Sequence, residues 1–520
     1  MPSGKVYTVA FAGSSLPANV DKLVAAAGGT IVVRLPEIGG LGVVSANPSF
    51  AATMSASASV AAAQRSVKTA LPPSDSTASF GASSASKLLT AATTVRAHRH
   101  RGGRGGGGGA GAGADPQPEP DDLGSEQWDK MRMNVSLTGS YAITQGRPQV
   151  RVAFTDSGVD QTHPDIRANL DLADSASFVT DAVTPDGVPI TAEPDIQDYN
   201  GHGTWTASAL AAPINGVGIS GVAPKVSIVE LKTQDMNGNG ILLWFDQAMV
   251  YAANKHFDIV SSSIVSYAQK CANGDDDVKQ PCDDADYVLA RRAVKYARDN
   301  GVLTVAAMGN DNLDLADAKT LASNAVFGVP GVVEVPGGLP GVVGVSATGY
   351  ANQKTYYSNY GQGIVDVAAP GGDPHLQPPN PDLYGAGGEL LAAWSSTANG
   401  APPLTFDDCG PPNPCYYAGL HGTSMAAPNA AGVAALIVSR YGDFSGTRRA
   451  HMDPDRVERA LTSSANAQPC PDPRTVTYAV PPGLFVFNYA TCKGGQGNNN
   501  AFFGSGIVDA VAALTRGGER

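Results

Sequence analysis

Long apolar runs are missing from this chain, and that shortage limits what the protein can be. No run of about 18 apolar residues occurs, so the sequence predicts no membrane-spanning helix and no membrane partner. Residues 1–5 precede a strand-like segment and lack the apolar core of a signal peptide. The hydrophobic content of 42% is ordinary for a globular protein, and 520 residues allow two or three domains.

Cysteine is also scarce, and none of it has the Cys-x-x-Cys spacing of a metal site. The six cysteines form three pairs that are local in sequence, separated by 11, 6 and 22 positions: Cys271 and Cys282, Cys409 and Cys415, Cys470 and Cys492. An even count in local pairs predicts disulfide bonds and an oxidising compartment. We therefore expect a secreted protein, although no signal peptide is visible; six buried thiols are the alternative.

Charge is unevenly distributed along the chain. Residues 1–114 contain 10 Lys and Arg against 3 Asp and Glu, which is about +7, and this leaves 25 against 44, or about −19, for residues 115–520. A basic segment joined to an acidic body suggests that the two parts attract or that the basic part is removed. Nucleic acid is not an expected partner of the acidic body.

Three regions follow from the local patterns. Residues 1–68 form a small α+β unit: strands over 5–11, 30–35 and 42–45 and helices over 17–27 and 48–60. The unit has few large apolar residues, so its core is thin and it needs a partner surface. Residues 69–120 are rich in Ser, Ala, Gly and Arg and form a flexible linker. The linker's basic cluster at 96–104 is interpreted as a protease-sensitive hinge, with a nucleic-acid tail as the alternative.

Residues 121–520 alternate between strand and helix. The expected strands are 150–155, 226–231, 258–265, 302–308, 342–347 and 364–369, and the expected helices are 202–212, 241–257, 285–300 and 424–440. This order predicts an α/β domain with a parallel sheet covered by helices on both faces. Active sites of such sheets lie at the carboxyl ends of the strands, where Asp156 and Asn310 fall.

The run Gly422-Thr423-Ser424-Met425-Ala426 is the strongest local signal. It places the Ser424 hydroxyl at the start of an Ala-rich helix, where free N–H groups and the helix dipole favour developing negative charge. A nucleophile that attacks a carbonyl needs such surroundings. The alternative is that Thr423 or Ser424 only caps the helix.

Two further motifs precede this run, in the order Asp, His, Ser. They are Thr155-Asp156-Ser157-Gly158, followed by His163-Pro164-Asp165, and Asn200-Gly201-His202-Gly203-Thr204. Together the three motifs resemble those of the subtilisin-like (subtilase, S8-type) serine peptidases over about residues 121–515. The resemblance implies a subtilisin-like fold and a serine endopeptidase that acts on protein or peptide substrates.

The family's chemistry transfers to matching positions. Ser424 would be the nucleophile, His202 the general base and acid, and Asp156 the group that orients and stabilises the imidazole. The resemblance also implies that the Asn310 side chain and the Ser424 N–H bind the oxyanion. A plain turn residue is the alternative for Asn310.

The resemblance further implies an extended substrate that pairs with an exposed strand. The matching positions are Ser261, Ser263, Val265, Met308 and Gly309. Val265 stands near a position that is often glycine in the family, and Met308 replaces a smaller residue. Trp205 also departs from the pattern, so substrate preference cannot be copied from the family.

A structural Ca²⁺ ion is a further implication of the resemblance. The oxygen ligands would come from the side chains of Asp165, Asn215 and Asp121 and from the carbonyls of Pro213, Val217 and Ile219. An ordinary Asx turn is the alternative. The run Asp275-Asp276-Asp277 is interpreted as a solvated loop tip.

The N-terminal unit resembles the inhibitory propeptides of this family by position and pattern only. A zymogen follows, in which residues 1–68 cover the cleft until the linker is cut; an autonomous binding domain is the alternative. We expect a monomer whose partners are its substrates and its own prodomain. The competing functions are an inert subtilase-like binding protein and a maturation protease dedicated to one peptide.

Overall fold

A parallel sheet of seven strands lies at the centre of the larger part of the molecule. The computed structural model describes residues 4–71, 121–269, 284–375, 388–402, 405–410, 412–446, 451–480, 483–495 and 499–516. The strand order is β17-β16-β14-β12-β6-β10-β7, and all neighbours pair in parallel. The strands are β6 (Arg151–Thr155), β7 (Ala176–Ser177), β10 (Ser227–Lys232), β12 (Ile259–Ser262), β14 (Leu303–Ala307), β16 (Val342–Thr348) and β17 (Val367–Pro370).

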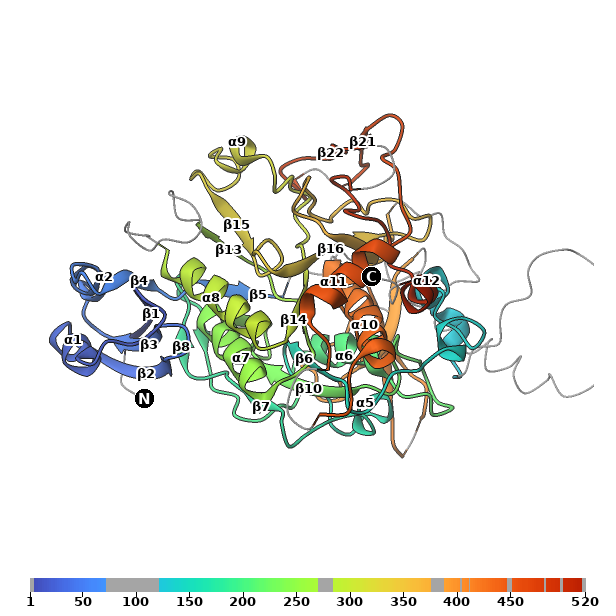
Figure 1. Ribbon diagram of the computed structural model, residues 1–520, viewed down its shortest axis with the longest axis horizontal. Helices are drawn as coiled ribbons and strands as arrows, with labels where there is room; N and C mark the ends of the chain where they lie inside the picture. The colour runs from blue at the N-terminus through green and yellow to red at the C-terminus, as the bar shows by residue number, and fades with distance from the viewer. Residues whose placement is uncertain are drawn as a thin grey trace, which may run out of the picture.

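Helices cover both faces of this sheet, as the sequence predicted (Figure 1). One face packs against α6 (His202–Ala211), α10 (Thr423–Tyr441), α11 (Pro454–Ser464) and α12 (Ala510–Arg516). The other packs against α7 (Leu242–Lys255) and α8 (Ala285–Asp299). Successive strand residues point to opposite faces, so Val152 and Phe154 join the first core and Ala153 joins the second. Because both faces are covered, β14 and β16 are buried along their whole length.

A second, antiparallel sheet forms the N-terminal unit, with strand order β2-β3-β1-β4. Its elements are β1 (Lys5–Phe11), α1 (Val20–Ala26), β2 (Gly29–Leu35), β3 (Gly40–Ser45), α2 (Phe50–Ser55) and β4 (Val60–Arg65). Helices α1 and α2 cover one face around Tyr7, Val43 and Phe50. The other face, with Val6 and Ala10, shares a core with α7 and α8 (Figure 1). The thin unit therefore has the partner surface that its composition demands.

The helix predicted over 48–60 is too long. Helix α2 ends at Ser55, and residues from Val60 onward pair antiparallel with β1 as an edge strand. Tertiary pairing here overrides the helix preference of an Ala-rich segment. The other predicted elements agree with the structure to within a few residues at their ends.

A short strand, β5 (Lys68–Ala70), connects the two parts. It pairs antiparallel with β11 (Asn239–Ile241), and Ala70 also bridges to Val265. The predicted linker thus contributes an ordered strand before its described part ends at Leu71. Helix α7 consequently begins at Leu242, one residue later than predicted.

Short elements surround this framework. They are α4 (Trp128–Arg132), α5 (Pro164–Arg167), β8 (Ala182–Val183), β9 (Pro189–Ile190), β13 (Ser266–Gln269), α9 (Ala318–Leu321), β15 (Val332–Val335), β18 (Leu390–Trp394), β19 (Thr405–Asp407), β20 (Tyr416–Leu420), β21 (Thr475–Thr477) and β22 (Tyr489–Thr491). Among the described helices, none combines the length and apolarity needed to cross a membrane.

Two of the three predicted disulfides are present. They join Cys409 to Cys415 and Cys470 to Cys492. The remaining pair, Cys271 and Cys282, and the acidic run 275–277 lie outside the described residues.

Candidate active site

Asp156 and His202 meet at the carboxyl end of the central sheet. Asp156 follows β6, and His202 is the first residue of α6. The imidazole Nδ1 lies 2.8 Å from Asp156 Oδ1 and 3.0 Å from Oδ2. The carboxylate also accepts hydrogen bonds from the Ser157 N–H and the Thr206 hydroxyl, at 2.8 and 3.0 Å. These contacts fix the carboxylate and direct the Nδ1 proton of His202 to it.

Asp198, which the sequence reading missed, ties the Asp156 and His202 loops together. Its fully buried carboxylate accepts hydrogen bonds from the Ser157 hydroxyl at 2.9 Å, the Gly201 N–H at 2.7 Å and the Thr204 N–H at 2.8 Å. The Ser157 hydroxyl in turn accepts from the Gly203 N–H. A short spacing, Asp-x-x-x-His, is the only sequence signal that could have indicated it.

The start of α6 approaches the turn after β6 very closely. A Cβ on Gly203 would lie 2.1 Å from the Gly158 carbonyl oxygen, a distance that no side chain can occupy. Glycine beside His202 is therefore required for the approach that brings the imidazole to Asp156.

Glu230 lies beneath this pair as a further buried carboxyl group. Burial, followed by the charges of Asp156 and Asp198, raises the pKa of Glu230 well above its ordinary value. Burial also raises the pKa of Asp198. The Gly158 N–H donates to Glu230 Oε1 at 3.2 Å.

Ser424 is the second residue of α10, and it does not cap that helix. The cap position belongs to Gly422, which makes no side-chain hydrogen bond, so the capping alternative is wrong. The Ser424 hydroxyl donates to the Ser263 carbonyl oxygen at 3.2 Å, and the Ser263 hydroxyl donates to the Ser424 carbonyl oxygen at 3.0 Å. His202 Nε2 is buried without a hydrogen-bond partner among the described residues.

The serine–histidine hydrogen bond is therefore not formed in this structure. Catalytic hydrogen bonds are often long or misaligned before substrate binds. For that bond to form, the Ser424 hydroxyl has to leave the Ser263 carbonyl oxygen.

The Asn310 side chain is held by the residue before Ser424. Its Oδ1 accepts from the Thr423 N–H at 2.9 Å and from the Thr423 hydroxyl at 2.7 Å. Because the oxygen is used, the amide N–H₂ group is left to donate elsewhere. Asn310 is thus anchored across the cleft as more than a turn residue.

The residues predicted to contact substrate separate into two groups. Ser263 and Val265 follow β12, and Gly309 follows β14, so these three lie at the sheet's carboxyl edge. Ser261 is inside β12, paired with Phe154 and Val305. Met308 is fully buried, with its sulfur against Gly337 and Gly344. The side chains of Ser261 and Met308 therefore do not reach the cleft.

Trp205 also points away from the cleft, contrary to what its place in the motif suggested. It is fully buried, donates from its indole N–H to the Ala418 carbonyl at 2.9 Å, and packs in a cluster with Trp128 and Tyr417. Its departure from the motif is structural, because α6 is buried along its whole length and the indole fills the cluster with Trp128 and Tyr417.

A groove of about 550 Å³ lies beside the site, and Lys68, Ala70 and Leu71 form part of its lining. Ala70 exchanges two hydrogen bonds with Val265, at 3.2 and 3.0 Å, and the Leu71 N–H donates to the Gly238 carbonyl at 2.9 Å. The segment is an extended strand between two others, the arrangement of a bound peptide. The second of these strands, β11, was not foreseen from the sequence.

The predicted calcium residues lie together in one loop region. Asp165 is fully buried, and it accepts from the Asn215 amide at 3.0 Å and the Tyr417 hydroxyl at 2.7 Å. Asp121 accepts from the N–H groups of Asn215 and Gly216 at 3.0 and 2.6 Å. Burial raises the pKa of Asp165 to about 7.

Within the described residues, no group of three or more His, Cys, Asp or Glu side chains is arranged to hold a metal. The predicted ligand set contains only two carboxylates, and amide and carbonyl oxygens would have to complete it. Two buried carboxylates joined by Asn215 still provide the hard oxygen donors that Ca²⁺ prefers, so the donor chemistry fits the ion.

Known proteins with the same combination of features are peptidases. A curated relative, the thermostable alkaline protease of Halalkalibacterium halodurans, is 30% identical over 298 residues, which are 57% of this chain and 59% of the relative. Subtilisin E of Bacillus subtilis is 26% identical over 318 residues, or 61% of this chain and 62% of the relative. The alignment thus spans about three fifths of the length of the curated relatives.

Among solved structures, the epidermin leader peptide processing serine protease EpiP of Staphylococcus aureus is similar over 99% of both chains. Its TM-score is 0.65 at 20% sequence identity, which establishes a shared fold. The Subtilase family (Peptidase_S8) model matches residues 147–506, well over half of the chain. This chain therefore belongs to the subtilase family of serine peptidases.

Proposed function

We propose that the chain is a serine endopeptidase made as a zymogen, with Ser424 as nucleophile. The observation that carries the proposal is the convergence of four polar groups at one sheet edge. Asp156 is bonded to His202, Ser424 lies at the start of α10, and Asn310 is anchored beside Ser424.

In the proposed reaction, His202 Nε2 accepts the Ser424 proton as the hydroxyl oxygen attacks the substrate carbonyl carbon. Asp156 stabilises the imidazolium that results, and it keeps the Nδ1 proton in place. The proton then passes to the leaving amine, which leaves an acyl-enzyme on Ser424. Water, activated by the same histidine, attacks the ester and releases the acid and the hydroxyl.

Two donors are proposed for the oxyanion: the Asn310 amide and the Ser424 N–H. The Thr423 contacts at 2.9 and 2.7 Å leave the Asn310 amide N–H₂ free to turn to the reacting oxygen. The Ser424 N–H belongs to the first turn of α10, where N–H groups lack helical partners. Both donors are positioned before the charge develops, which is what makes them effective.

The zymogen proposal rests on the docking of the N-terminal unit. Arg292 on α8 donates to the carbonyls of Phe11, Gly13 and Ile38 at 2.9 to 3.1 Å. Strand β5 then enters the groove in an extended conformation. We propose that residues 1–68, together with β5, inhibit the enzyme as a prodomain, that the linker to residue 120 is cut, and that residues 121–520 are the peptidase.

The disulfides support a secreted enzyme, since such bonds persist in oxidising compartments. We propose a monomer whose partners are its substrates and its prodomain. We also propose one structural Ca²⁺ held by Asp121, Asp165 and Asn215, with the carbonyls of Pro213, Val217 and Ile219. When bound, the ion would neutralise two buried carboxylates and stabilise the loop.

A fluorophosphonate probe tests the central proposal because it labels an activated serine whatever the substrate preference. The full chain should be labelled once its linker is cut, and Ser424→Ala should not be labelled. Failure of the processed wild-type protein to take up label would favour the inert binding protein.

A maturation protease for one peptide is a second candidate. A lanthipeptide protease of known structure is 25% identical to this chain and has a TM-score of 0.51. The match covers 75% of this chain and 94% of the lanthipeptide protease. Digestion of casein distinguishes the two candidates. Cuts at many sites support a broad endopeptidase, and intact casein alongside a labelled Ser424 supports the dedicated enzyme.

A further inference from the structure

The ordered strand β5 shows where a substrate's reacting residue would lie. Ala70 opposes Val265 in an antiparallel bridge, so a residue two places later in the same register opposes Ser263. The Ser263 carbonyl accepts the Ser424 hydroxyl at 3.2 Å, so that residue carries the carbonyl nearest the nucleophile. Side chains two positions apart on a strand lie on the same face. The side chain of the residue opposite Ser263 therefore points to the same side as that of Ala70, which lines the groove.

That side of the groove carries negative charge. Its lining includes Tyr267, Asn310 and Asp311. The Tyr267 hydroxyl donates to the Asp311 carboxylate and accepts from the Asn359 amide, the latter at 3.0 Å. Among the described residues, no lysine or arginine forms an ion pair with Asp311; Lys68, which also lines the groove, pairs with Asp186.

A second carboxyl group, Glu334, lies behind Tyr267. The two residues are directly opposed across the antiparallel pair β13 and β15, so their side chains share a face. Glu334 is 1% exposed, and its Oε2 accepts from the Gly338 N–H at 3.0 Å. Its Oε1 is buried and has no hydrogen-bond partner among the described residues. A buried oxygen without a donor is costly unless a ligand supplies one.

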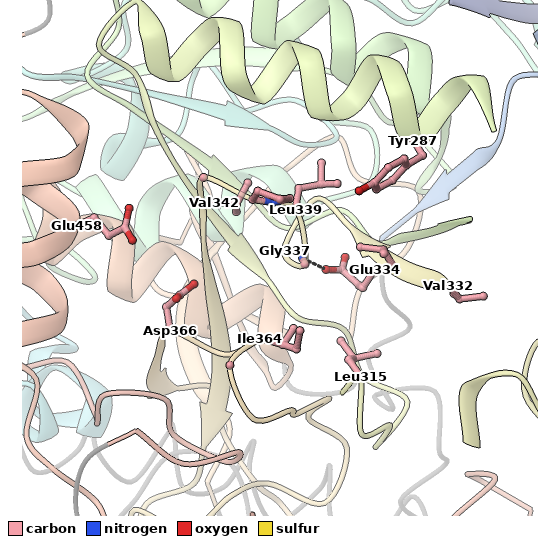
Figure 2. A pocket seen from close by; sticks show the side chains of 15 residues that line it. Tyr287, Leu315, Val332, Glu334, Gly337, Leu339, Val342, Ile364, Asp366 and Glu458 are labelled. Carbon is pink, nitrogen blue, oxygen red and sulfur yellow. Dashed lines mark hydrogen bonds between the residues drawn. The ribbon is translucent and has the colours of Figure 1, made fainter. Parts of the chain in front are cut away.

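More acidic side chains surround the far side of Glu334. It lines a cavity of about 370 Å³ together with Asp366 and Glu458, as Figure 2 shows. Of these, Glu458 is paired with Arg298. Burial raises the pKa of Glu334, and the nearby Asp311 raises it further, so the two carboxyl groups interact. A cation between Glu334 and Asp311 would reduce the electrostatic repulsion between the two carboxyl groups.

The groove is also narrow at this point. A Cβ on Gly309 would lie 3.5 Å from both Val265 Cγ1 and the Tyr267 hydroxyl, and 2.6 Å from the Asn359 amide nitrogen. Gly309 has a φ of +93°, which only glycine adopts readily. Any side chain at position 309 would therefore collide with the Asn359 amide, so this wall of the groove requires glycine.

We infer that the groove selects a basic residue, arginine before lysine, on the acyl side of the cleaved bond, with Glu334 and Asp311 as its counter-charges. The inference deepens the proposed function and rests on it. The planar guanidinium group carries five N–H donors, enough for the free Glu334 Oε1, Asp311 and the Tyr267 oxygen together. Lysine has fewer donors and no planar fork, and an apolar side chain would leave both carboxyl groups unpaired.

The chain's own sequence contains candidate cleavage sites with a basic residue on the acyl side. The residues that follow β5 in sequence are Leu71-Pro72-Pro73, which contain no basic side chain. The linker between the two proposed functional parts contains four arginines within nine positions: Arg96, Arg99, Arg101 and Arg104. The inference therefore predicts that maturation cuts after one of these arginines.

A peptide series tests the preference directly. Quenched fluorescent peptides that differ only at the acyl-side residue (Arg, Lys, Gln, Leu or Phe) are compared on the processed full chain. We expect kcat/KM to be highest for Arg, and Glu334→Gln to lower the Arg-to-Leu ratio about 10- to 100-fold. Asp311→Asn should lower the same ratio, and it remains informative if Glu334→Gln fails to fold.

The mature N-terminus is a second and independent measurement. Intact mass should place it directly after Arg96, Arg99, Arg101 or Arg104, and replacement of all four by Gln should abolish that cut. A preference for Leu or Phe, or a mature end after an apolar residue, overturns the inference. In that case fluorophosphonate labelling of Ser424 would still support the proposed function, whereas loss of both labelling and cleavage would overturn both.

Discussion

The reacting centre and the cavity behind Tyr267 each contain a buried carboxyl group, and the two groups differ in how many hydrogen bonds their oxygens accept. Asp156 is 2% exposed and Glu334 is 1% exposed. Asp156 accepts hydrogen bonds on both oxygens, from Ser157, Thr206 and His202. Glu334 has a donor on one oxygen only.

This difference distinguishes a carboxyl group that the chain itself holds in place from one that still has an oxygen free to accept a hydrogen bond. Every donor to Asp156 comes from this chain, so the carboxylate is positioned before any substrate arrives. The free oxygen of Glu334 needs a donor from outside to be satisfied. The number of hydrogen bonds that a buried carboxyl group accepts from the chain therefore distinguishes Asp156, which holds the catalytic geometry, from Glu334, which we propose contacts the substrate.

Asp156→Asn should have the largest effect of the changes considered. An amide cannot stabilise the imidazolium and favours the wrong tautomer of His202, so kcat should fall about 10⁴-fold. Steady-state cleavage of the best peptide measures it. Asp443→Asn, at an exposed carboxylate, is the control and should leave kcat unchanged. Equal losses in the two variants would remove the special role given to Asp156.

Asn310→Ala should follow, with kcat lowered about 10²- to 10³-fold and KM little changed, because the donor acts on the transition state. Thr423→Val removes the hydroxyl that holds Asn310 Oδ1 at 2.7 Å, so it should cost less, about tenfold. In the Asn310→Ala background, Thr423→Val should add little if Thr423 acts through Asn310. Full additivity of the two losses would contradict that connection.

The reacting centre could be predicted from sequence because each of its residues lies in a short motif with its own chemistry. Asp156, His202 and Ser424 needed only the sheet to bring them together, and the alternation of strands and helices predicted that sheet. Motif position did not predict side-chain direction: Trp205 and Met308 adjoin the site in sequence but point into the interior. Which buried cluster each side chain joins depends on tertiary packing that the motifs do not encode.

The residues proposed to bind a basic side chain could not be predicted in the same way. Tyr267, Asp311 and Glu334 come from three separate segments, and their meeting depends on the antiparallel pairing of β13 with β15. No periodicity in either short strand indicates that partner. Likewise, β5 became visible only through its pairing with β11, since a strand of three residues is too short to show a period in the sequence.

Asp286 is a third buried carboxyl group, and it lies at the surface on which the N-terminal unit docks. It is fully buried and accepts from Thr8, Gln64 and Val67 at 2.7, 2.8 and 3.0 Å. Burial and, to a smaller extent, the charge of Asp284 raise the pKa of Asp286 from 3.8 to about 7. Asp246, with both oxygens unpartnered among the described residues, lies close enough for Asp286 to raise its pKa as well.

A carboxyl group whose pKa is raised by folding stabilises the fold below its unfolded pKa, and this contribution is lost as pH rises through the folded value. The full-length chain should therefore lose stability between pH 4 and 7. The upper limit from Asp286 is about 4 kcal/mol; we expect about half, because the interacting carboxyl groups of Asp286 and Asp246 titrate as a pair.

The measurement is thermal unfolding of the uncleavable Ser424→Ala chain at several pH values, with and without Asp286→Asn. The variant should gain stability relative to its parent as pH rises from 4 to 8. Asp299→Asn, exposed on the same helix and paired with Lys295, is the matched control and should show no such gain. A pH-independent difference between Asp286→Asn and its parent would mean that Asp286 does not titrate in this range.

Asp165 is the smallest test, since it concerns a loop and not the reacting centre. Like Asp156, it accepts hydrogen bonds on both oxygens, from Asn215, Tyr417 and the Ile219 N–H. A Ca²⁺ ion bound there should raise Tm by about 2 °C at saturating concentration, because a ligand bound only by the folded state stabilises it. A chelator should reverse the shift, and Asp165→Asn should abolish it, while the exposed Asp181→Asn should retain it. If Tm does not respond to calcium in the parent chain, the hydrogen bonds alone satisfy both carboxylates of the loop, and saturation by the chain's own donors then marks a site that needs no ligand, as it does at Asp156.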